Sequence, residues 1–171
     1  WPNPAAKVKP YKKSQRDRFL QPEELPRFFK ALNQFEEKDE GFDEAFRDYV
    51  LLLLFTGARK MNLLSMRWQN ISFERAEWTI PAEETKSGET ITIPLCSYAM
   101  KILQKRRESM SADWVFPNKK ATAPMYEPRR DWNRFRELAG VPDVTIHDLR
   151  RTLGSWTAIT GASLPIIGRA L

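Results

Sequence analysis

An uninterrupted apolar segment in the first third of the chain constrains the fold more than any other feature. The seven residues Tyr49-Val50-Leu51-Leu52-Leu53-Leu54-Phe55 are too few to cross a membrane and too rich in leucine to prefer a β-strand. They predict a buried helix over residues 43–55, with Gly57 as its C-terminal stop. A chain of 171 residues with 42% hydrophobic content can bury one core around such a helix.

The residues after Gly57 predict a corner between two helices. Arg59 lies at this corner, and an arginine in such a place is usually an ordinary surface charge. The next helix is predicted to bury the apolar side chains of Leu63, Leu64 and Met66.

Two short alternating segments then predict an antiparallel hairpin. Residues 77–80 and 91–94 alternate between polar and apolar side chains, as half-buried strands do. The turn-like sequence Thr85-Lys86-Ser87-Gly88 lies between them, so Lys86 is expected near the tip of the hairpin.

Further helices are predicted over residues 22–33, 97–110 and 127–139. Proline at position 22 suits the first position of a helix, and serine at position 97 suits a cap. In the last of these helices, Trp132, Phe135 and Leu138 recur at helical spacing and are predicted to face the core. Residues 36–44 are predicted to form an acidic, solvated loop.

The segment Thr145-Ile146-His147-Asp148-Leu149-Arg150-Arg151-Thr152 is the most informative for function. Thr145 and Asp148 fit a capping box, so His147 and Arg150 share one face near a helix N-terminus. Free backbone N–H groups, the helix dipole and a forked guanidinium all favour a phosphate there. The plainer interpretation is a capped helix with a solvated arginine and a surface histidine, and this segment alone does not separate the two.

The distribution of charge favours a polyanionic partner. The net charge is +6, but it divides into +5 over residues 1–18, −5 over residues 19–100 and +6 over residues 101–171. Separation of sign along a chain favours nucleic acid over a uniformly solvated surface. Residues 1–18, with three prolines among lysines, are predicted to be an extended basic linker from a preceding domain.

Cysteine and histidine usage argues against several other classes. Cys96 is the only cysteine and His147 the only histidine, so neither a disulfide scaffold nor a zinc site can be assembled from these residue types. The sequence also contains no signal peptide and no membrane span. We therefore expect no metal and a cytoplasmic location.

Three separated motifs, in order, resemble the catalytic domain of tyrosine recombinases, the phage-integrase family. They are Thr56-Gly57-Ala58-Arg59 with the following Leu63-Leu64-Ser65-Met66-Arg67-Trp68, then Thr85-Lys86-Ser87-Gly88, then His147-Asp148-Leu149-Arg150-Arg151-Thr152. The resemblance covers residues 19–171. It implies the DNA breaking-rejoining fold, mainly helical with a small three-stranded antiparallel β-sheet over about residues 71–94.

The resemblance also implies roles for four residues. Arg59 and Arg150 are expected to clamp the phosphate, since a metal-free site needs other positive donors as charge develops on the non-bridging oxygens. Lys86 is expected to protonate the leaving 5′ oxygen. His147 is expected either to accept a proton from the tyrosine nucleophile or to hydrogen-bond the phosphoryl oxygens. The family's 3′-phosphotyrosine intermediate conserves bond energy, so no cofactor is implied.

The chain departs from the family pattern in two places. An acid often follows the first arginine by three residues, and Asn62 stands there instead. The tyrosine nucleophile belongs to a segment expected after Leu171, and the four tyrosines present (Tyr11, Tyr49, Tyr98 and Tyr126) all precede His147. We therefore expect a fragment that binds double-stranded DNA without cutting it, from a protein that forms a homo-oligomer on DNA when full length.

Two alternatives remain open at this point. The chain can be a DNA-binding module of the same fold that never cleaves and keeps the clamp for affinity alone. It can also be an unrelated basic helical domain that binds RNA or protein. The continuation of the reading frame separates a catalytic protein from the first alternative, and convergence of Arg59, Lys86, His147 and Arg150 in space excludes the second.

Overall fold

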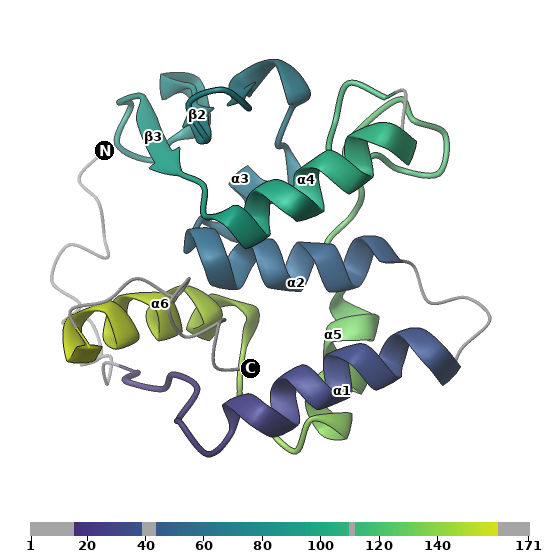
Figure 1. Cartoon of the computed structure of the whole chain (residues 1–171), viewed down its shortest axis with the longest axis vertical. Coiled ribbons are helices and arrows are strands. Elements are labelled where there is room, and N and C mark those ends of the chain that lie inside the picture. The colour runs from purple at the N-terminus through teal and green to yellow at the C-terminus, as the bar shows by residue number, and fades with distance from the viewer. Residues whose placement is uncertain (1–15, 39–43, 110–111, 161–171) are drawn as a thin grey trace, which may run out of the picture.

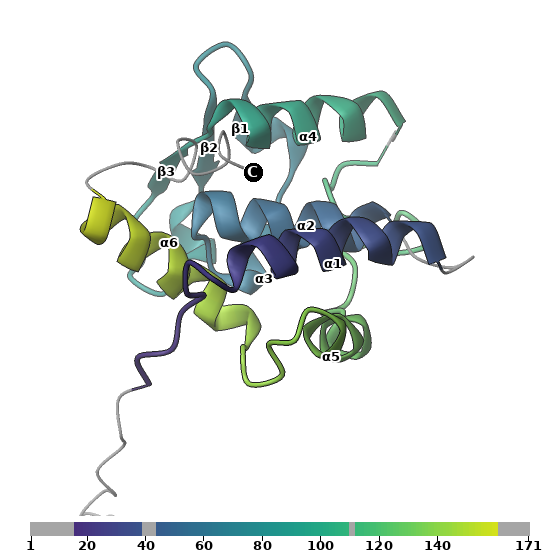
Figure 2. The ribbon, with the colours of Figure 1, turned by 60° about the horizontal axis from the view of Figure 1, so that its bottom comes forward.

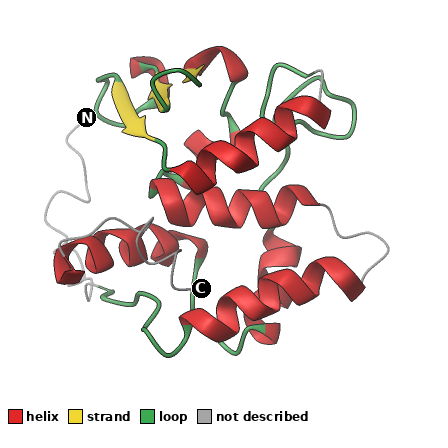
Figure 3. Ribbon diagram, viewed as in Figure 1, coloured by secondary structure: helices red, strands yellow, loops and turns green. Residues whose placement is uncertain are grey.

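The computed structural model describes residues 16–38, 44–109 and 112–160. Helices dominate this part of the chain, and three short strands lie together at one end (Figure 3). Within the described ranges no helix has both the length and the apolar character needed to cross a membrane. The elements are α1 (Leu25–Lys38), α2 (Glu44–Thr56), α3 (Lys60–Leu64), η2 (Trp68–Asn70), β1 (Ile71–Ser72), β2 (Glu77–Ile80), η3 (Ala82–Glu84), β3 (Ile91–Pro94), α4 (Ser97–Ser109), α5 (Arg129–Leu138) and α6 (Ile146–Thr160).

Helix α2 is the centre of the fold. It runs through the middle of the molecule, with α4 on one side and α1 and α6 on the other (Figure 1), and it packs against all three and against α3. Most of its side chains are buried. The predicted buried helix over residues 43–55 is therefore confirmed to within one residue at each end. Leucine on every face suits a helix with packing partners on every side.

The sheet is antiparallel, with strand order β1-β2-β3. The pair Trp78↔Ile93 lies in its centre, and Trp78 is almost fully buried. The predicted strands over residues 77–80 and 91–94 match β2 and β3 at both ends. Residues 81–90 connect them and include the short helix η3, so Lys86 lies in a connection longer than a tight turn.

Aromatic side chains join α1, α2 and α5 on the far side of the core. Phe28 meets Phe135 edge to face, with ring centroids 4.9 Å apart, and Phe46 meets the same ring at 5.9 Å. Trp132 and Phe135 are buried as predicted, whereas Leu138 is half exposed, so its predicted core position was wrong. The helix ends at Leu138, so packing constrains that side chain less.

Two predicted helix boundaries also need correction. Helix α1 begins at Leu25 rather than at position 22, because residues 21–24 form a turn in which Glu24 accepts a hydrogen bond from the Gln21 N–H at 2.8 Å. It continues to Lys38, so the first part of the predicted acidic loop is helical, and residues 39–43 lie outside the described ranges. Helix α5 begins at Arg129, two residues later than predicted, after Pro128.

The predicted linker and the C-terminal residues are only partly visible. Residues 1–15 and 161–171 lie outside the described ranges, as does position 110 of the predicted helix over residues 97–110. The last linker residues are ion-paired to the domain: Arg18 contacts Glu24 at 2.7 Å and Asp143 at 2.6 Å.

Candidate active site

Arg59 is presented by the corner between α2 and α3. Gly57 ends α2 with a left-handed backbone (φ +60°), and its N–H donates to the Leu53 carbonyl at 2.9 Å. Arg59 then takes an extended conformation immediately before α3, and its side chain is exposed. Gly57 therefore ends the helix as predicted, and Arg59 lies at the predicted corner between two helices.

Gly57 also permits a close approach by α6. A Cβ atom at this position would lie 2.7 Å from Cδ2 of Leu153, a contact that real Cβ atoms do not make. One turn before Leu153, the Arg150 guanidinium donates a hydrogen bond to the Gly57 carbonyl oxygen. The corner that presents Arg59 is thus tied directly to the helix that presents Arg150.

The two arginines line one cavity of about 480 Å³. Its walls are the end of α2, the α2–α3 corner, Asn62 of α3, the end of β2, strand β3 and one face of α6. Ser87 reaches it from the β2–β3 connection. Figure 2 shows β3 and the outer end of α6 on the same side of the molecule. Among the described residues lining the cavity, Arg59 and Arg150 are the only charged ones. A concave site with two guanidinium groups and no lining carboxylate favours an anion.

His147 and Lys86 are not among the residues that line this cavity. His147 lies one turn before Arg150 on the first turn of α6 and is exposed. Lys86 is exposed beside Ser87. The structure therefore brings the two predicted arginines to one cavity. Lys86 adjoins Ser87, which lines that cavity, and His147 lies one helical turn before Arg150.

The surroundings of His147 favour its neutral form. Partial burial and the neighbouring Arg151 guanidinium lower the pKa of His147 below its usual value. Arg150 and Lys60 act in the same direction, and Asp148 opposes them. At neutral pH the imidazole therefore has a ring nitrogen free of a proton, which suits a proton acceptor.

Asp148 organises the start of α6. Its fully buried carboxylate accepts hydrogen bonds from the Thr145 N–H at 2.8 Å, the Thr145 hydroxyl at 2.8 Å, Arg151 at 2.8 Å and Arg16 at 2.9 to 3.2 Å. Burial alone would raise the pKa of Asp148, but the hydrogen bonds from Arg16, Thr145 and Arg151 outweigh it and lower the pKa to about 2.

The predicted capping box is half confirmed. The acid reaches back to the Thr145 N–H as predicted, but the Thr145 hydroxyl donates to that carboxylate and does not accept from the backbone. Arg16, from the predicted linker, was not expected in this cluster. Its contact spans 132 residues of sequence, and its only sequence signal was the basic character of the linker.

Asn62 is a second residue whose contact was not predicted. It is buried on α3, and its Nδ2 donates to the Glu84 carbonyl oxygen at 2.8 Å. Its position three residues after Arg59, between the apolar residues Met61 and Leu63, is the signal that could have found it. A buried amide needs a hydrogen-bond partner, and the neighbouring β2–β3 connection supplies one.

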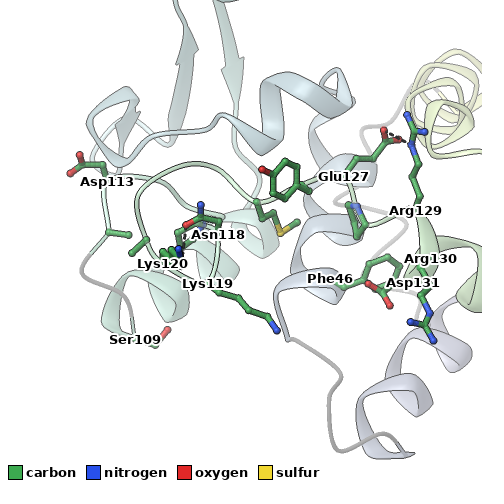
Figure 4. A pocket seen from close by; sticks show the side chains of 16 residues that line it. Phe46, Ser109, Asp113, Asn118, Lys119, Lys120, Glu127, Arg129, Arg130 and Asp131 are labelled. Atoms are coloured by element: carbon green, nitrogen blue, oxygen red, sulfur yellow. Dashed lines mark hydrogen bonds and ion pairs between the residues drawn. The ribbon is translucent and has the colours of Figure 1, made fainter.

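A larger cavity, of about 1,320 Å³, lies elsewhere and shares no lining residue with the first. Lys119 and Lys120 border it on one side, and Arg129 and Arg130 at the start of α5 border it on the other (Figure 4). Arg129 is ion-paired to Glu127 at 3.1 Å. None of the four predicted site residues lines it, whereas Arg59 and Arg150 both line the smaller cavity.

Comparison with known proteins identifies the family to which this geometry belongs. The model of the phage integrase family matches residues 18–171, nearly the whole chain. The chain belongs to the phage integrase family. The prophage integrase IntF of Escherichia coli K12 is 32% identical over 95% of this chain and 35% of its own length. The integrase of Salmonella phage P22 is 29% identical over 96% of the chain and 42% of its own length.

A solved structure agrees with this family at the level of fold. The Tn1549 transposon integrase, in complex with circular intermediate DNA, superposes with a TM-score of 0.68. The identity is 16%, and the match covers 91% of this chain and 57% of that one. The expected class, mainly helical with a three-stranded antiparallel sheet, is confirmed. The chain spans between a third and a half of the length of these curated integrases.

Proposed function

We propose that this family member supplies the phosphate-clamping part of a site-specific DNA recombinase. In this proposal, the protein cleaves and rejoins double-stranded DNA through a 3′-phosphotyrosine intermediate. The observation that carries it is the cavity in which Arg59 and Arg150 are the only charged residues among the described ones that line it. The hydrogen bond from Arg150 to the Gly57 carbonyl oxygen ties the two elements that carry these arginines together. Two forked guanidinium groups match the non-bridging oxygens of one phosphodiester.

The four predicted residues divide the chemistry among them. Arg59 and Arg150 stabilise the negative charge that develops on the phosphoryl oxygens. His147, with its lowered pKa, accepts the proton from the attacking tyrosine hydroxyl or hydrogen-bonds the phosphoryl group. Lys86 approaches from the β2–β3 connection, whose Ser87 already lines the cavity, and protonates the leaving 5′ oxygen.

The described tyrosines do not suit the role of nucleophile. Tyr49 is fully buried, and burial raises the pKa of its hydroxyl. Tyr98 stacks on Phe55, with ring centroids 6.0 Å apart, and Tyr126 lines the larger cavity. We therefore propose that none of these three is the nucleophile. Tyr11 precedes every family motif in the sequence, so we assign the role to a tyrosine of the longer protein. Our proposed partners are double-stranded DNA and further copies of the longer protein assembled on it.

A non-catalytic DNA-binding module of the same fold is the alternative. The same tyrosine positions favour it, because the two-arginine cavity binds a phosphate with or without a nucleophile nearby. In both proposals, the isolated chain binds duplex DNA with a steep dependence on salt, since phosphate contacts release counterions.

Cleavage of a suicide DNA substrate distinguishes the two. The longer protein that carries this chain and the downstream tyrosine is incubated with a nicked duplex that traps the covalent intermediate. A tyrosine-linked adduct on the 3′ phosphate is expected with the longer protein and not with the 171-residue chain. Sequence-specific binding without any adduct from the longer protein supports the non-catalytic module, and an adduct through Tyr126 contradicts our placement of the nucleophile.

A further inference from the structure

We propose that Asn62 is a positioning residue. It holds the loop that contains Lys86 (residues 85–89) against helix α3, which begins beside Arg59. This inference rests on the proposed cleavage function and deepens it. It assigns a role to the residue that stands where the family often carries an acid.

The contact joins the two halves of the site. Asn62 lies three residues after Arg59, is 6% exposed, and donates from Nδ2 to the Glu84 carbonyl oxygen at 2.8 Å. Glu84 is the last residue of η3 and precedes Lys86 by two positions. A short, buried hydrogen bond thus connects the element that presents the first arginine to the segment that presents the lysine.

A second hydrogen bond from α3 contacts Glu84. The hydroxyl of Ser65, at the C-terminal end of α3, lies 3.0 Å from Oε2 of Glu84, 3.0 Å from the Met61 carbonyl oxygen and 3.2 Å from the Asn62 carbonyl oxygen. It has one proton to donate, and the charged Glu84 carboxylate is the strongest of these acceptors. Helix α3 therefore holds Glu84 at both its backbone and its carboxylate. Two contacts from one helix define the orientation of Glu84 better than a single contact does.

The loop beyond Glu84 is closed on itself. The Thr85 hydroxyl lies 3.0 Å from the Ala82 carbonyl oxygen and 2.8 Å from the Glu89 carbonyl oxygen, and its one proton is donated to one of them at a time. It also accepts a hydrogen bond from the Glu89 N–H at 3.1 Å. The Gly88 N–H also donates to the Thr85 carbonyl at 3.3 Å. Lys86 belongs to this closed loop, so movement of its base at Glu84 carries Lys86 with it.

The chemistry of the partner explains why an amide stands at position 62. The Glu84 carbonyl oxygen can only accept a hydrogen bond, and the amide of Asn62 supplies the donor. A carboxylate at the same position has no proton to donate at neutral pH. It would also place a negative charge beside that oxygen and near the Glu84 carboxylate, which pushes the loop away. The family's usual acid therefore does not fit this contact.

The affected step is the departure of the 5′ oxygen. The tyrosine oxygen forms its bond to phosphorus as the bond from phosphorus to the 5′ oxygen breaks, and the Lys86 ammonium gives that oxygen a proton and becomes neutral. When sulfur replaces the bridging 5′ oxygen of the substrate, the leaving group departs as a stable thiolate and needs no proton. Loss of Lys86 positioning slows cleavage of the oxygen substrate and spares the sulfur substrate, whereas damage to the arginine clamp slows both.

The test compares single-turnover cleavage of both substrates by the longer protein that carries this chain and the nucleophilic tyrosine. We expect Asn62→Asp to slow cleavage of the oxygen substrate by at least about tenfold, a partial loss of the roughly 10²- to 10⁴-fold that a positioned general acid contributes. We expect the same variant to cleave the sulfur substrate within about threefold of the wild-type rate, a smaller loss than the tenfold expected with the oxygen substrate. Lys86→Ala is the reference for slow cleavage of the oxygen substrate alone. Arg59→Ala is the reference for slow cleavage of both substrates.

Ser65→Ala provides a milder variant on the same contact. It removes the second grip on Glu84 while leaving the buried amide in place, and it should show the same selectivity with a smaller loss. Equal slowing of both substrates by Asn62→Asp and Ser65→Ala, or wild-type rates on the oxygen substrate, overturns the positioning role. Absence of any adduct from the wild-type protein on either substrate overturns the cleavage function itself, and this inference with it.

Discussion

The Arg150 guanidinium donates a hydrogen bond to the backbone carbonyl oxygen of Gly57, two residues before Arg59 and 93 residues away in sequence. This contact makes the α2–α3 corner and helix α6 one structural unit. A glycine at position 57 is favoured by its backbone conformation, and it also leaves room for the end of the Leu153 side chain. The local stability of this corner and the geometry of the proposed phosphate site are therefore linked.

Gly57→Ala should destabilise the domain more than Gly88→Ala. Both glycines have positive φ, at +60° and +70°, so both substitutions carry the backbone cost of about 1 kcal/mol. Only at Gly57 does the new methyl group meet Cδ2 of Leu153, so the end of that side chain must shift, which adds about 0.5 to 1.5 kcal/mol for an off-rotamer leucine. Urea unfolding gives the two free energies of unfolding, and equal losses would show that α6 does not approach this closely.

Asp148 should contribute stability that disappears in acid. Its pKa is about 2 in the folded protein and near 3.8 in the unfolded chain, so the contribution is present above about pH 4 and is lost as the pH falls towards 2. The difference corresponds to about 2 kcal/mol. Comparing wild type with Asp148→Asn removes the effect of other carboxylates: the gap in free energy of unfolding should narrow from pH 5 to pH 2, and a constant gap contradicts the assignment.

Breaking a buried ion pair of helix α4 should lower the free energy of unfolding much more than breaking an exposed ion pair of the same helix. Arg106 contacts Asp48 at 3.0 Å with both side chains almost fully buried, whereas the Lys105–Glu44 pair is exposed. Burial raises the pKa of Asp48, and the hydrogen bond from Arg106 opposes that rise. Arg106→Met therefore leaves an unpaired buried carboxyl.

The expected cost of Arg106→Met is about 3 to 5 kcal/mol, against at most about 1 kcal/mol for the control Lys105→Met. Adding Asp48→Leu to Arg106→Met should recover part of the loss, because it removes the stranded group. Chemical unfolding of the four proteins measures this, and a double variant no more stable than Arg106→Met contradicts the electrostatic explanation.

Local patterns predicted the elements that depend on neighbours in sequence. The apolar run predicted α2, alternation predicted β2 and β3, and the glycine at position 57 predicted the corner that presents Arg59. Family motifs singled out Arg59 and Arg150, which the fold places on one cavity. These features succeed because propensity and spacing act over a few residues.

Contacts between distant segments could not be predicted in the same way. Arg16 reaches Asp148 across 132 residues, and Asn62 reaches Glu84 through a connection whose path depends on the η3 helix. Nothing in the periodicity of either segment encodes its partner. The exposed Leu138 shows the converse: helical spacing placed it with Trp132 and Phe135, but the helix ends there and the core does not extend to it.

The decisive prediction for function concerns the arginine clamp in the longer, tyrosine-bearing protein. Arg59→Ala and Arg150→Ala should each slow single-turnover cleavage by about a hundredfold or more, the scale for losing one preorganised donor to a developing oxyanion. Binding of duplex DNA should weaken far less, because many other phosphate contacts remain. Arg75→Ala, which removes an exposed arginine ion-paired to Glu77 at 3.1 Å, is the matched control and should leave both quantities nearly unchanged. Near wild-type cleavage by both clamp variants would mean that Arg59 and Arg150 are ordinary surface charges.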